Sequence, residues 1–263
     1  LRRGLKQRKI DEELLRGQIT KEAIEARQSG DAAKINQVFE KMSRVAYGEG
    51  VTAQMREDFL VKYGCSAYTD EILAYLVENL AFQRGIIEVG AGNGQWARAL
   101  SDRYDEHIQK PEQREQIRKN FDFILPYDDK TSLPLSPQIY HKHTKPAALY
   151  FHPDVRTSDS ANSMLRKWEN RGRVLLLVYP PPGPMALETV KTYVNVCPER
   201  NDLVVYVGEG KGGANGNDEL FDYWLNSGEW AVVKIMDVRP SPGGKGFEKM
   251  FVLKRVRTGE ESV

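Results

Sequence analysis

The pattern of apolar and polar positions changes close to residue 64. Up to Tyr63, apolar residues recur at helical spacing among charged positions, and no run is typical of a strand. Breaks at Gly17, at 29–31 and at 48–50 divide this stretch into about three helices, with Asp31 as an N-cap. The apolar positions are Ile10, Leu14, Leu15, Ile24, Ile35, Val38, Phe39, Met42 and Val45. We therefore predict a helical N-terminal extension over residues 1–63 and a second domain over residues 64–263.

The second domain alternates helical segments with short, nearly continuous apolar runs. A helix is expected from about residue 69 to 80, capped by Thr69 or Asp70. The strand candidates are Ile86–Val89, Phe121–Pro126, a third-strand region at Leu149–Val155, Val174–Tyr179, Leu203–Val207, Trp230–Val238 and Lys249–Val256. Apolar runs separated by helices are typical of a parallel sheet that is covered on both faces.

The last two strand candidates are connected differently from the others. The segment 239–248 between them is too short for a crossover helix, so these strands should form an antiparallel hairpin. The predicted fold class is therefore α/β, with a doubly wound, mostly parallel seven-stranded sheet, a C-terminal antiparallel hairpin and the N-terminal helical extension.

Composition limits the classes of protein that need to be considered. Lys and Arg total 38 against 37 Asp and Glu, a net charge of +1. The chain as a whole therefore has no excess of positive charge that would bind polyanions over its entire surface. No apolar run approaches the roughly 20 residues of a membrane span. Cys65 and Cys197 are too few for a disulfide framework, which predicts an intracellular, reducing compartment. The basic, acid-free start at residues 1–9 is either an artificial boundary of the sequence or the remnant of a processed presequence, and the compartments to consider are the cytoplasm and the mitochondrion.

A glycine turn follows the first predicted strand. It reads Glu88-Val89-Gly90-Ala91-Gly92-Asn93-Gly94 and leads into a helix. Glycines permit a tight turn and close approach of a ligand, and the helix start offers free N–H donors. A dinucleotide site would place its third glycine one residue later, where Gln95 stands, and a P-loop would continue with Gly-Lys-Ser/Thr. The spacing therefore disfavours NAD and ATP.

This turn closely resembles motif I of the class I S-adenosylmethionine-dependent methyltransferases, an acid followed by x-G-x-G-x-G. The resemblance covers roughly residues 68–256, and a terminal antiparallel hairpin is typical of the same family. It implies S-adenosylmethionine as cofactor, with Glu88 holding the amino group of the methionine part. The cofactor-binding set that it implies at the turn is Glu88, Gly90, Ala91, Gly92, Gly94 and Trp96. The alternative is a glycine turn that only lets a helix pack closely on the sheet.

The same resemblance implies an acid at the end of the second strand that binds the ribose hydroxyls. Asp128 is the preferred residue and Asp129 the second choice, while the alternative is a pair of turn carboxylates without a ligand. A residue in the third-strand region, up to position 159, should approach the adenine. Which residue does so is left open.

Two loops at the carboxyl edge of the sheet carry the candidate chemistry. Methyltransferases that act on amino groups of nucleobases or glutamine have Asp/Asn/Ser-Pro-Pro-aromatic after the fourth strand, whereas this chain has Tyr179-Pro180-Pro181-Pro182. We assign Tyr179, Pro180 and Pro181 to the catalytic side, with Tyr179 also beside the cofactor; a rigid proline turn without chemistry is the alternative.

The second loop lies in the sequence Val205-Tyr-Val-Gly-Glu-Gly-Lys-Gly-Gly213, which resembles a little-characterised branch of methyltransferase-like proteins. Here Glu209 is a candidate on the substrate side, and a flexible lid is the alternative reading. The pair His141-x-His143 has no carboxylate at metal spacing, so no metal site is predicted.

The leading functional prediction is a methyltransferase whose acceptor is RNA or a component of a ribonucleoprotein. The basic start and the aromatic residues Tyr127, Tyr140 and Tyr179 suit RNA binding, and the N-terminal helices could dock on a protein partner. The alternative is a catalytically silent methyltransferase-like scaffold or assembly factor in a larger complex. An NAD-dependent oxidoreductase conflicts with both the glycine spacing and the hairpin.

Overall fold

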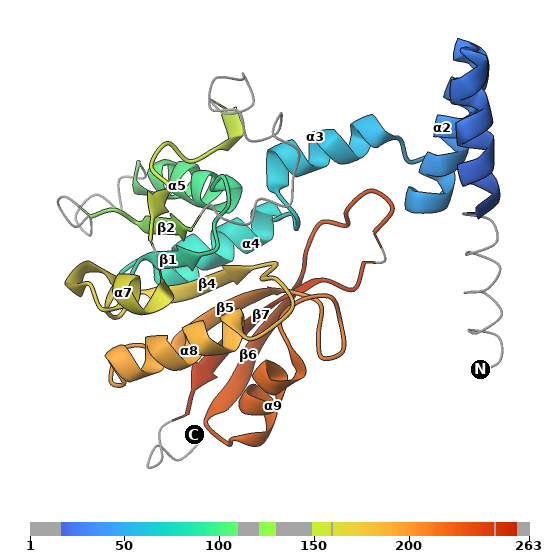
Figure 1. Ribbon diagram of the computed structural model, residues 1–263. Helices are drawn as coiled ribbons and strands as arrows, with labels where there is room; N and C mark the ends of the chain where they lie inside the picture. Colours follow the sequence, from blue (N-terminus) through green and yellow to red (C-terminus); the bar gives the residue numbers. More distant parts are fainter. Residues whose placement is uncertain (1–16, 110–120, 130–148, 159, 245, 257–263) are drawn as a thin grey trace. The chain divides into compact units, whose positions relative to one another are not determined.

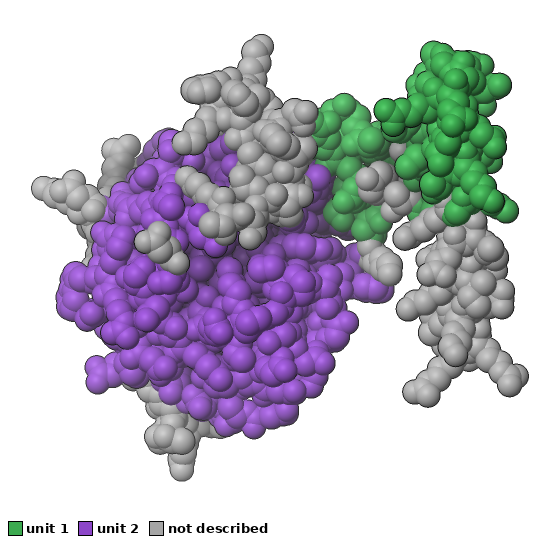
Figure 2. Space-filling model, in the orientation of Figure 1, with its two compact units in different colours: residues 1–58, 241–245 green, residues 59–240, 246–263 purple. Residues whose placement is uncertain are grey.

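The computed structural model describes residues 17–109, 121–129, 149–158, 160–244 and 246–256 (Figure 1). The chain divides into two compact units, one made of residues 1–58 with 241–245 and the other of residues 59–240 with 246–263 (Figure 2). The predicted division between residues 63 and 64 stays a prediction about where an independently folding domain begins.

The first unit is helical, as its sequence pattern indicates. A helix covers residues 17–29, and α2 (Ala32–Tyr47) follows it. The Asp31 side chain accepts hydrogen bonds from the N–H groups of Ala33 and Lys34, which confirms Asp31 as the N-cap. A third helix, α3 (Ala53–Tyr63), begins in this unit and ends in the second.

The apolar positions of the first unit are only partly buried. Its small core comprises Ile19, Ala26 and Val38, packed by Ala23, Ile35 and Val45. By contrast, the side chains of Ile24, Phe39 and Met42 are exposed. The predicted apolar positions Ile10, Leu14 and Leu15 lie outside the described residues. Helical spacing therefore predicted the described helices of this unit, while several of the same apolar positions are exposed in the structure.

The second unit is built on a seven-stranded sheet in the order β3-β2-β1-β4-β5-β7-β6. Its strands are β1 (Ile86–Val89), β2 (Ile124–Asp128), β3 (Arg156–Thr157), β4 (Val174–Val178), β5 (Leu203–Gly208), β6 (Trp230–Asp237) and β7 (Lys249–Arg255). The first five strands are parallel, and β7 is antiparallel to both β5 and β6. The predicted doubly wound α/β fold with a C-terminal hairpin is confirmed.

Helices cover both faces of the sheet (Figure 1). On one face lie α4 (Asp70–Ala74), its π-helical continuation η1 (Tyr75–Ala81) and α5 (Gln95–Ile108). On the other lie α7 (Ala161–Leu165), α8 (Met185–Val196) and α9 (Asp218–Asn226), while the short η3 (Trp168–Asn170) follows α7. Alternate residues of each central strand point into the two cores, as the two-residue period of a strand requires. The Thr69 hydroxyl accepts from the N–H of Ile72, which confirms Thr69 as the cap of α4.

Two predicted strands are displaced in the structure. We predicted the second strand to begin at Phe121, but β2 begins at Ile124, because its neighbour β1 begins at Ile86 and the two pair in that register. The third strand lies at Arg156–Thr157, just after the predicted region 149–155, because β3 pairs with the end of β2. Pairing partners, which a single strand pattern does not show, set both boundaries.

No helix in the described ranges is long and apolar enough to cross a membrane. Cys65 and Cys197 are not joined by a disulfide in the part of the chain that the structure describes.

Candidate functional site

A pocket of about 660 Å³ opens at the carboxyl ends of β1, β2 and β4. Residues 88–93 line it at the end of β1 and beyond, residues 127–129 at the end of β2, and Val178, Tyr179, Pro181 and Pro182 at the end of β4 and beyond. The strand order reverses between β1 and β4, so the pocket lies at the switch point of the sheet, where open α/β sheets bind their ligands.

The acidic side chains that line this pocket have no basic counterpart in its described lining. They are Glu88, Asp128 and Asp129, and no Lys, Arg or His is present among the lining residues that the structure describes. We call this the acidic pocket. Its charge favours a ligand that carries positive charge and disfavours one held by phosphates.

The glycine turn adopts backbone angles that side chains rarely tolerate. Gly90, Gly92 and Gly94 have φ of 78°, 58° and 74°. A Cβ on Gly94 would lie 2.6 Å from the Cβ of His152, whereas one on Gly92 would meet nothing within 4 Å. Gly94 therefore allows the turn to pack closely against His152 and Val155, while the backbone at Gly92 faces open space in the acidic pocket.

Asp128 holds the turn from the neighbouring strand. Its Oδ2 accepts a hydrogen bond of 2.7 Å from the N–H of Gly92. The N–H groups of Gly90 and Ala91 donate to the carbonyl of Tyr127 at 2.9 and 3.0 Å. The ends of β1 and β2 are thus joined, and the Asp128 carboxylate lies at the pocket wall.

Glu88 is a buried acid with an unsatisfied oxygen. Its side chain is 2% exposed, and Oε2 has no hydrogen-bond partner among the described residues. Burial, and secondarily the neighbouring Asp128 charge, raises the pKa of Glu88 to about 8, while a backbone hydrogen bond with Ala97 acts in the opposite direction. The group is therefore mainly protonated at neutral pH, and a cation placed beside it would favour its ionised form.

Trp96 forms part of the wall through its ring. Its indole N–H donates to the carbonyl of Ser66 at 2.7 Å. The ring of Tyr68 packs edge-on against the indole, with 5.5 Å between the ring centroids. Its polar donor is already used within the fold, so Trp96 offers a ligand only apolar surface.

The loop after β4 begins with a strained residue. Tyr179 has φ of 49°, the one positive value at a non-glycine position in the described ranges, and this turn ends β4 one residue earlier than predicted. Its N–H donates to the carbonyl of Val207 at 2.7 Å. Burial raises the pKa of the Tyr179 hydroxyl, so this group stays neutral at physiological pH and acts by hydrogen bonding or stacking rather than as a base.

Asn215 connects the two loops, and sequence reasoning missed it. Its Nδ2 donates to the carbonyl of Pro180 at 3.2 Å, and its Oδ1 accepts from the N–H of Glu209 at 3.1 Å. Pro182 forms a bridge with Gly216 beside it. The only sequence signal is an amide residue within a glycine-rich run, which by itself is typical of any loop.

The pocket gathers most of the predicted site residues. Those that line it are Glu88, Gly90, Ala91, Gly92, Trp96, Asp128, Asp129, Tyr179 and Pro181. Gly94 belongs to the turn without lining the pocket, and Pro180 is buried behind it. The Glu209 carboxylate is turned back onto its own loop, where Oε2 accepts from the N–H of Ala214 at 3.1 Å. On the side of β3 and α7, the wall is formed by Ser158, Ser160, Ala161 and Met164.

Comparison with known proteins found similarity only at the level of structure. No protein-family profile and no curated protein sequence matches the chain. Among solved structures, an uncharacterised protein from Listeria monocytogenes serotype 4b is 10% identical with a TM-score of 0.43, over 74% of this chain and 71% of that one. A candidate tRNA (m1A22) methyltransferase from Streptococcus pneumoniae is 11% identical with a TM-score of 0.40, over 73% and 71%.

A third similar structure is the magnesium protoporphyrin IX methyltransferase of Synechocystis PCC 6803 with bound SAH. It is 12% identical with a TM-score of 0.39, and the match covers 86% of this chain and all of that one. Similarity at this level does not determine the activity of the present chain, so the case for a function rests on the pocket itself.

Proposed function

We propose that this protein is an S-adenosylmethionine-dependent methyltransferase. The observation that carries the proposal is the acidic pocket at the switch point, with the buried, unsatisfied carboxyl of Glu88 and no basic residue among its described lining. S-adenosylmethionine carries a sulfonium and an ammonium group, and both suit such a pocket. A dinucleotide or nucleoside triphosphate would bring several negative charges to it instead.

The residues present fit this cofactor. Glu88 Oε2 would accept from the ammonium group, and the open space at Gly92 would admit the methionine arm. Asp128 would accept hydrogen bonds from the ribose hydroxyls while it continues to hold the turn. The wall of Ser158, Ala161 and Met164 would contact the adenine.

The bound cofactor supplies a methyl group on a good leaving group, so the protein's task is mainly alignment. In this proposal Tyr179 and Pro181 position the acceptor at the pocket mouth, Tyr179 by stacking or through its neutral hydroxyl and Pro181 through its carbonyl. Asn215 joins the loop after β4 to the loop after β5 by hydrogen bonds to Pro180 and Glu209. These bonds would keep Tyr179 and Pro181 in place, and an in-line transfer requires such fixed positions.

We further propose that the acceptor is RNA or a component of a ribonucleoprotein. Support comes from the basic start at residues 1–9 and from an aromatic side chain, Tyr179, at the pocket. A chain that lacks residues 1–48 should keep cofactor binding, because every lining residue follows Gly48, but should lose RNA affinity. Equal RNA affinity of the full and shortened chains would contradict this part of the proposal.

Calorimetric titration with S-adenosylmethionine and S-adenosylhomocysteine, with NADH as the control, tests the cofactor directly. Micromolar binding of the first two without binding of NADH is expected. A folded protein that binds neither at millimolar concentration would refute the methyltransferase proposal.

One observation favours a second candidate, a methyltransferase-like scaffold without catalysis. The Pro180 carbonyl is an expected hydrogen-bond acceptor for a substrate NH₂ group, but it already accepts a hydrogen bond from the Asn215 side-chain amide. The two candidates differ in one measurement. Transfer of a radiolabelled methyl group to cellular RNA or ribonucleoprotein fractions supports the enzyme, whereas cofactor binding without transfer to any fraction supports the scaffold.

A further inference from the structure

A second pocket lies at the amino ends of the parallel strands, on the side of the sheet opposite the acidic pocket. It has a volume of about 840 Å³ and is lined by residues that lie just before three parallel strands, namely Arg84 two residues before β1, Arg173 before β4 and Asp202 before β5. Because all parallel strands begin on one side of the sheet and end on the other, this pocket lies at their amino ends and the acidic pocket at their carboxyl ends. The two pockets cannot share one small ligand.

The second pocket, unlike the acidic pocket, is lined by basic side chains. Four arginines line it, Arg84, Arg171, Arg173 and Arg200, and we call it the arginine pocket. Three carboxylates also line it, those of Glu169, Glu199 and Asp202. The net charge that this pocket offers a ligand therefore depends on which guanidinium groups the fold already engages.

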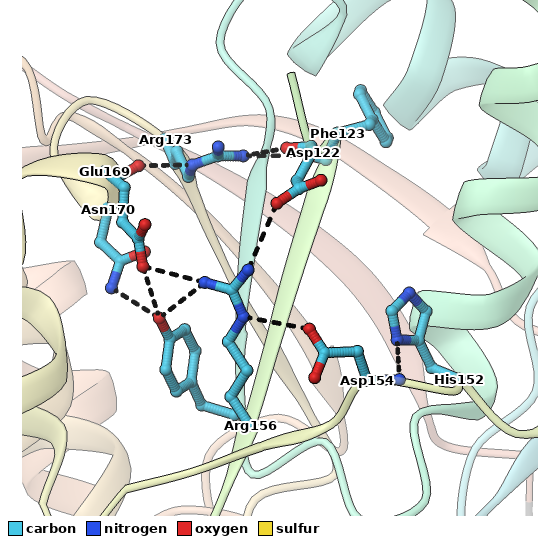
Figure 3. Close-up of polar contacts among 9 residues, drawn as sticks. Asp122, Phe123, His152, Asp154, Arg156, Glu169, Asn170 and Arg173 are labelled. Carbon is cyan, nitrogen blue, oxygen red and sulfur yellow. Dashed lines mark hydrogen bonds and ion pairs between the residues drawn. The ribbon is translucent and has the colours of Figure 1, made fainter. Parts of the chain in front are cut away.

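Arg84 and Arg173 serve the fold. Arg84 pairs with Asp202 at 2.7 Å and donates to the Gly172 carbonyl at 2.8 Å. Arg173 donates to the backbone carbonyls of Glu169 and Asp122, each at 2.7 Å (Figure 3). The Glu169 carboxylate pairs with Arg156 at 2.9 Å, in the same network. These groups hold the pocket wall together and are not available to a ligand.

Arg171 and Arg200 are different. Within the described ranges neither has a carboxylate within 4.0 Å. Arg171 donates from Nη2 to the Arg166 carbonyl at 3.1 Å, but its buried Nε has no hydrogen-bond partner there. The Arg200 guanidinium lies against Gly172, where an added Cβ would come within 2.8 Å of Nε. Two guanidinium groups of the lining, those of Arg171 and Arg200, therefore remain to receive an anion.

An exposed aromatic ring stands beside these two groups. Trp168 is 77% exposed, and the Arg171 guanidinium lies 5.5 Å from its ring centroid. A side chain this exposed leaves most of its indole ring accessible to a stacking ligand. An indole face beside guanidinium donors matches a ligand that joins a flat ring to a negatively charged group.

We propose that the arginine pocket binds a nucleotide unit, with its phosphate on Arg171 and Arg200 and its base stacked on Trp168. The volume suits a ligand of this size. The unit can be a free nucleotide or one residue of a single-stranded RNA, because both present the same base and phosphate. The proposal does not depend on methyl transfer, since no residue of the acidic pocket takes part.

Titration of the full-length chain with AMP, adenosine, inorganic phosphate and an oligoadenylate of about eight nucleotides tests it. AMP or the oligomer should bind more tightly than adenosine or phosphate alone. Binding of AMP identifies a free nucleotide as a sufficient ligand, and binding of the oligomer alone identifies a strand. Trp168→Ala and the double variant Arg171→Ala/Arg200→Ala should each lower the affinity about tenfold or more.

Arg98→Ala provides the matched control, because Arg98 is a partly exposed arginine on α5 that lines neither pocket. Its affinity for the oligomer and AMP should equal that of the unaltered chain. Trp168 and Arg200 are exposed, so their variants should fold, which a melting curve checks. The proposal is overturned if both variants bind like the control, if phosphate alone binds as tightly as AMP, or if neither AMP nor the oligomer binds at millimolar concentration.

Discussion

The carboxylate of Asp128 accepts a 2.7 Å hydrogen bond from the backbone N–H of Gly92, which joins the end of β2 to the glycine turn after β1. This bond fixes both partners at the wall of the acidic pocket. Asp128 therefore has two roles to separate, one in holding the turn and one proposed for the ribose of the cofactor.

Replacing Asp128 separates these roles. Asp128→Ala removes the carboxylate and the bond to Gly92, and it should weaken S-adenosylmethionine binding by about 1.5 to 3 kcal/mol, roughly ten- to a hundredfold. Asp128→Asn keeps an acceptor for Gly92 and should lose less. Calorimetry on both variants, with Asp129→Ala for comparison, measures this. Unchanged affinity in Asp128→Ala would exclude the ribose assignment.

Glu88→Gln should stabilise the empty protein while it weakens cofactor binding. The pKa of Glu88 rises from 4.5 to about 8 on folding, so between these values the folded chain holds more protons than the unfolded chain. The free energy of unfolding therefore falls as pH rises through this window. Removing the acid should raise stability at pH 8 by about 1 to 3 kcal/mol and change little near pH 5.

Denaturant unfolding at the two pH values measures this effect, and Glu57→Gln, which replaces an exposed glutamate on α3, is the control. The same Glu88 variant should bind S-adenosylmethionine at least about tenfold more weakly, because an amide cannot offer the charge that an ammonium group prefers. A Glu88 variant that is no more stable at pH 8 than at pH 5, relative to the unaltered chain, would speak against this account.

Alanine at Gly92 and at Gly94 should have different effects. At Gly94 the new Cβ would collide with His152 and with the Val155 side chain, at 2.6 and 2.8 Å, so Gly94→Ala should lower the melting temperature clearly. At Gly92 there is open space, and only backbone strain of about 1 kcal/mol is expected. Gly92→Ala should therefore stay folded but bind the cofactor more weakly. Equal loss of stability in the two variants would contradict this distinction.

Asn215→Ala should loosen both loops beside the acidic pocket. It leaves the Pro180 carbonyl and the Glu209 N–H without their partner, at a cost of about 1 to 3 kcal/mol in stability. Methyl transfer should slow more than cofactor binding weakens, because the acceptor side loses its alignment. Asn217→Ala is the matched control, since Asn217 only caps α9 through the N–H of Leu220. Equal effects of the two variants on transfer would remove Asn215 from the site.

Local patterns were enough for much of the fold. Buried parallel strands are continuous apolar runs, so β4 and β5 were predicted to within one residue. The boundaries of β2 and β3 were displaced, because they depend on register with a neighbouring strand and the neighbour lies far away in the chain. The end of β4 at Val178 depends on the unusual backbone angle of Tyr179, which nothing in its sequence neighbourhood indicates.

The sequence by itself determined the fold class, the capping residue Asp31 and the position of the glycine turn, because each follows from residues that are close together in the chain. It left Thr69 and Asp70 as alternatives for the cap of α4, and the structure selected Thr69. Only the tertiary structure brought Asn215 to Pro180, buried one oxygen of Glu88 without a hydrogen-bond partner among the described residues, and assembled Arg84, Arg171 and Arg200 around one pocket. These features come from segments that the sheet order, not the chain order, makes neighbours. Hydrogen bonds and charges of this kind depend on distance in space, and a linear pattern does not record it.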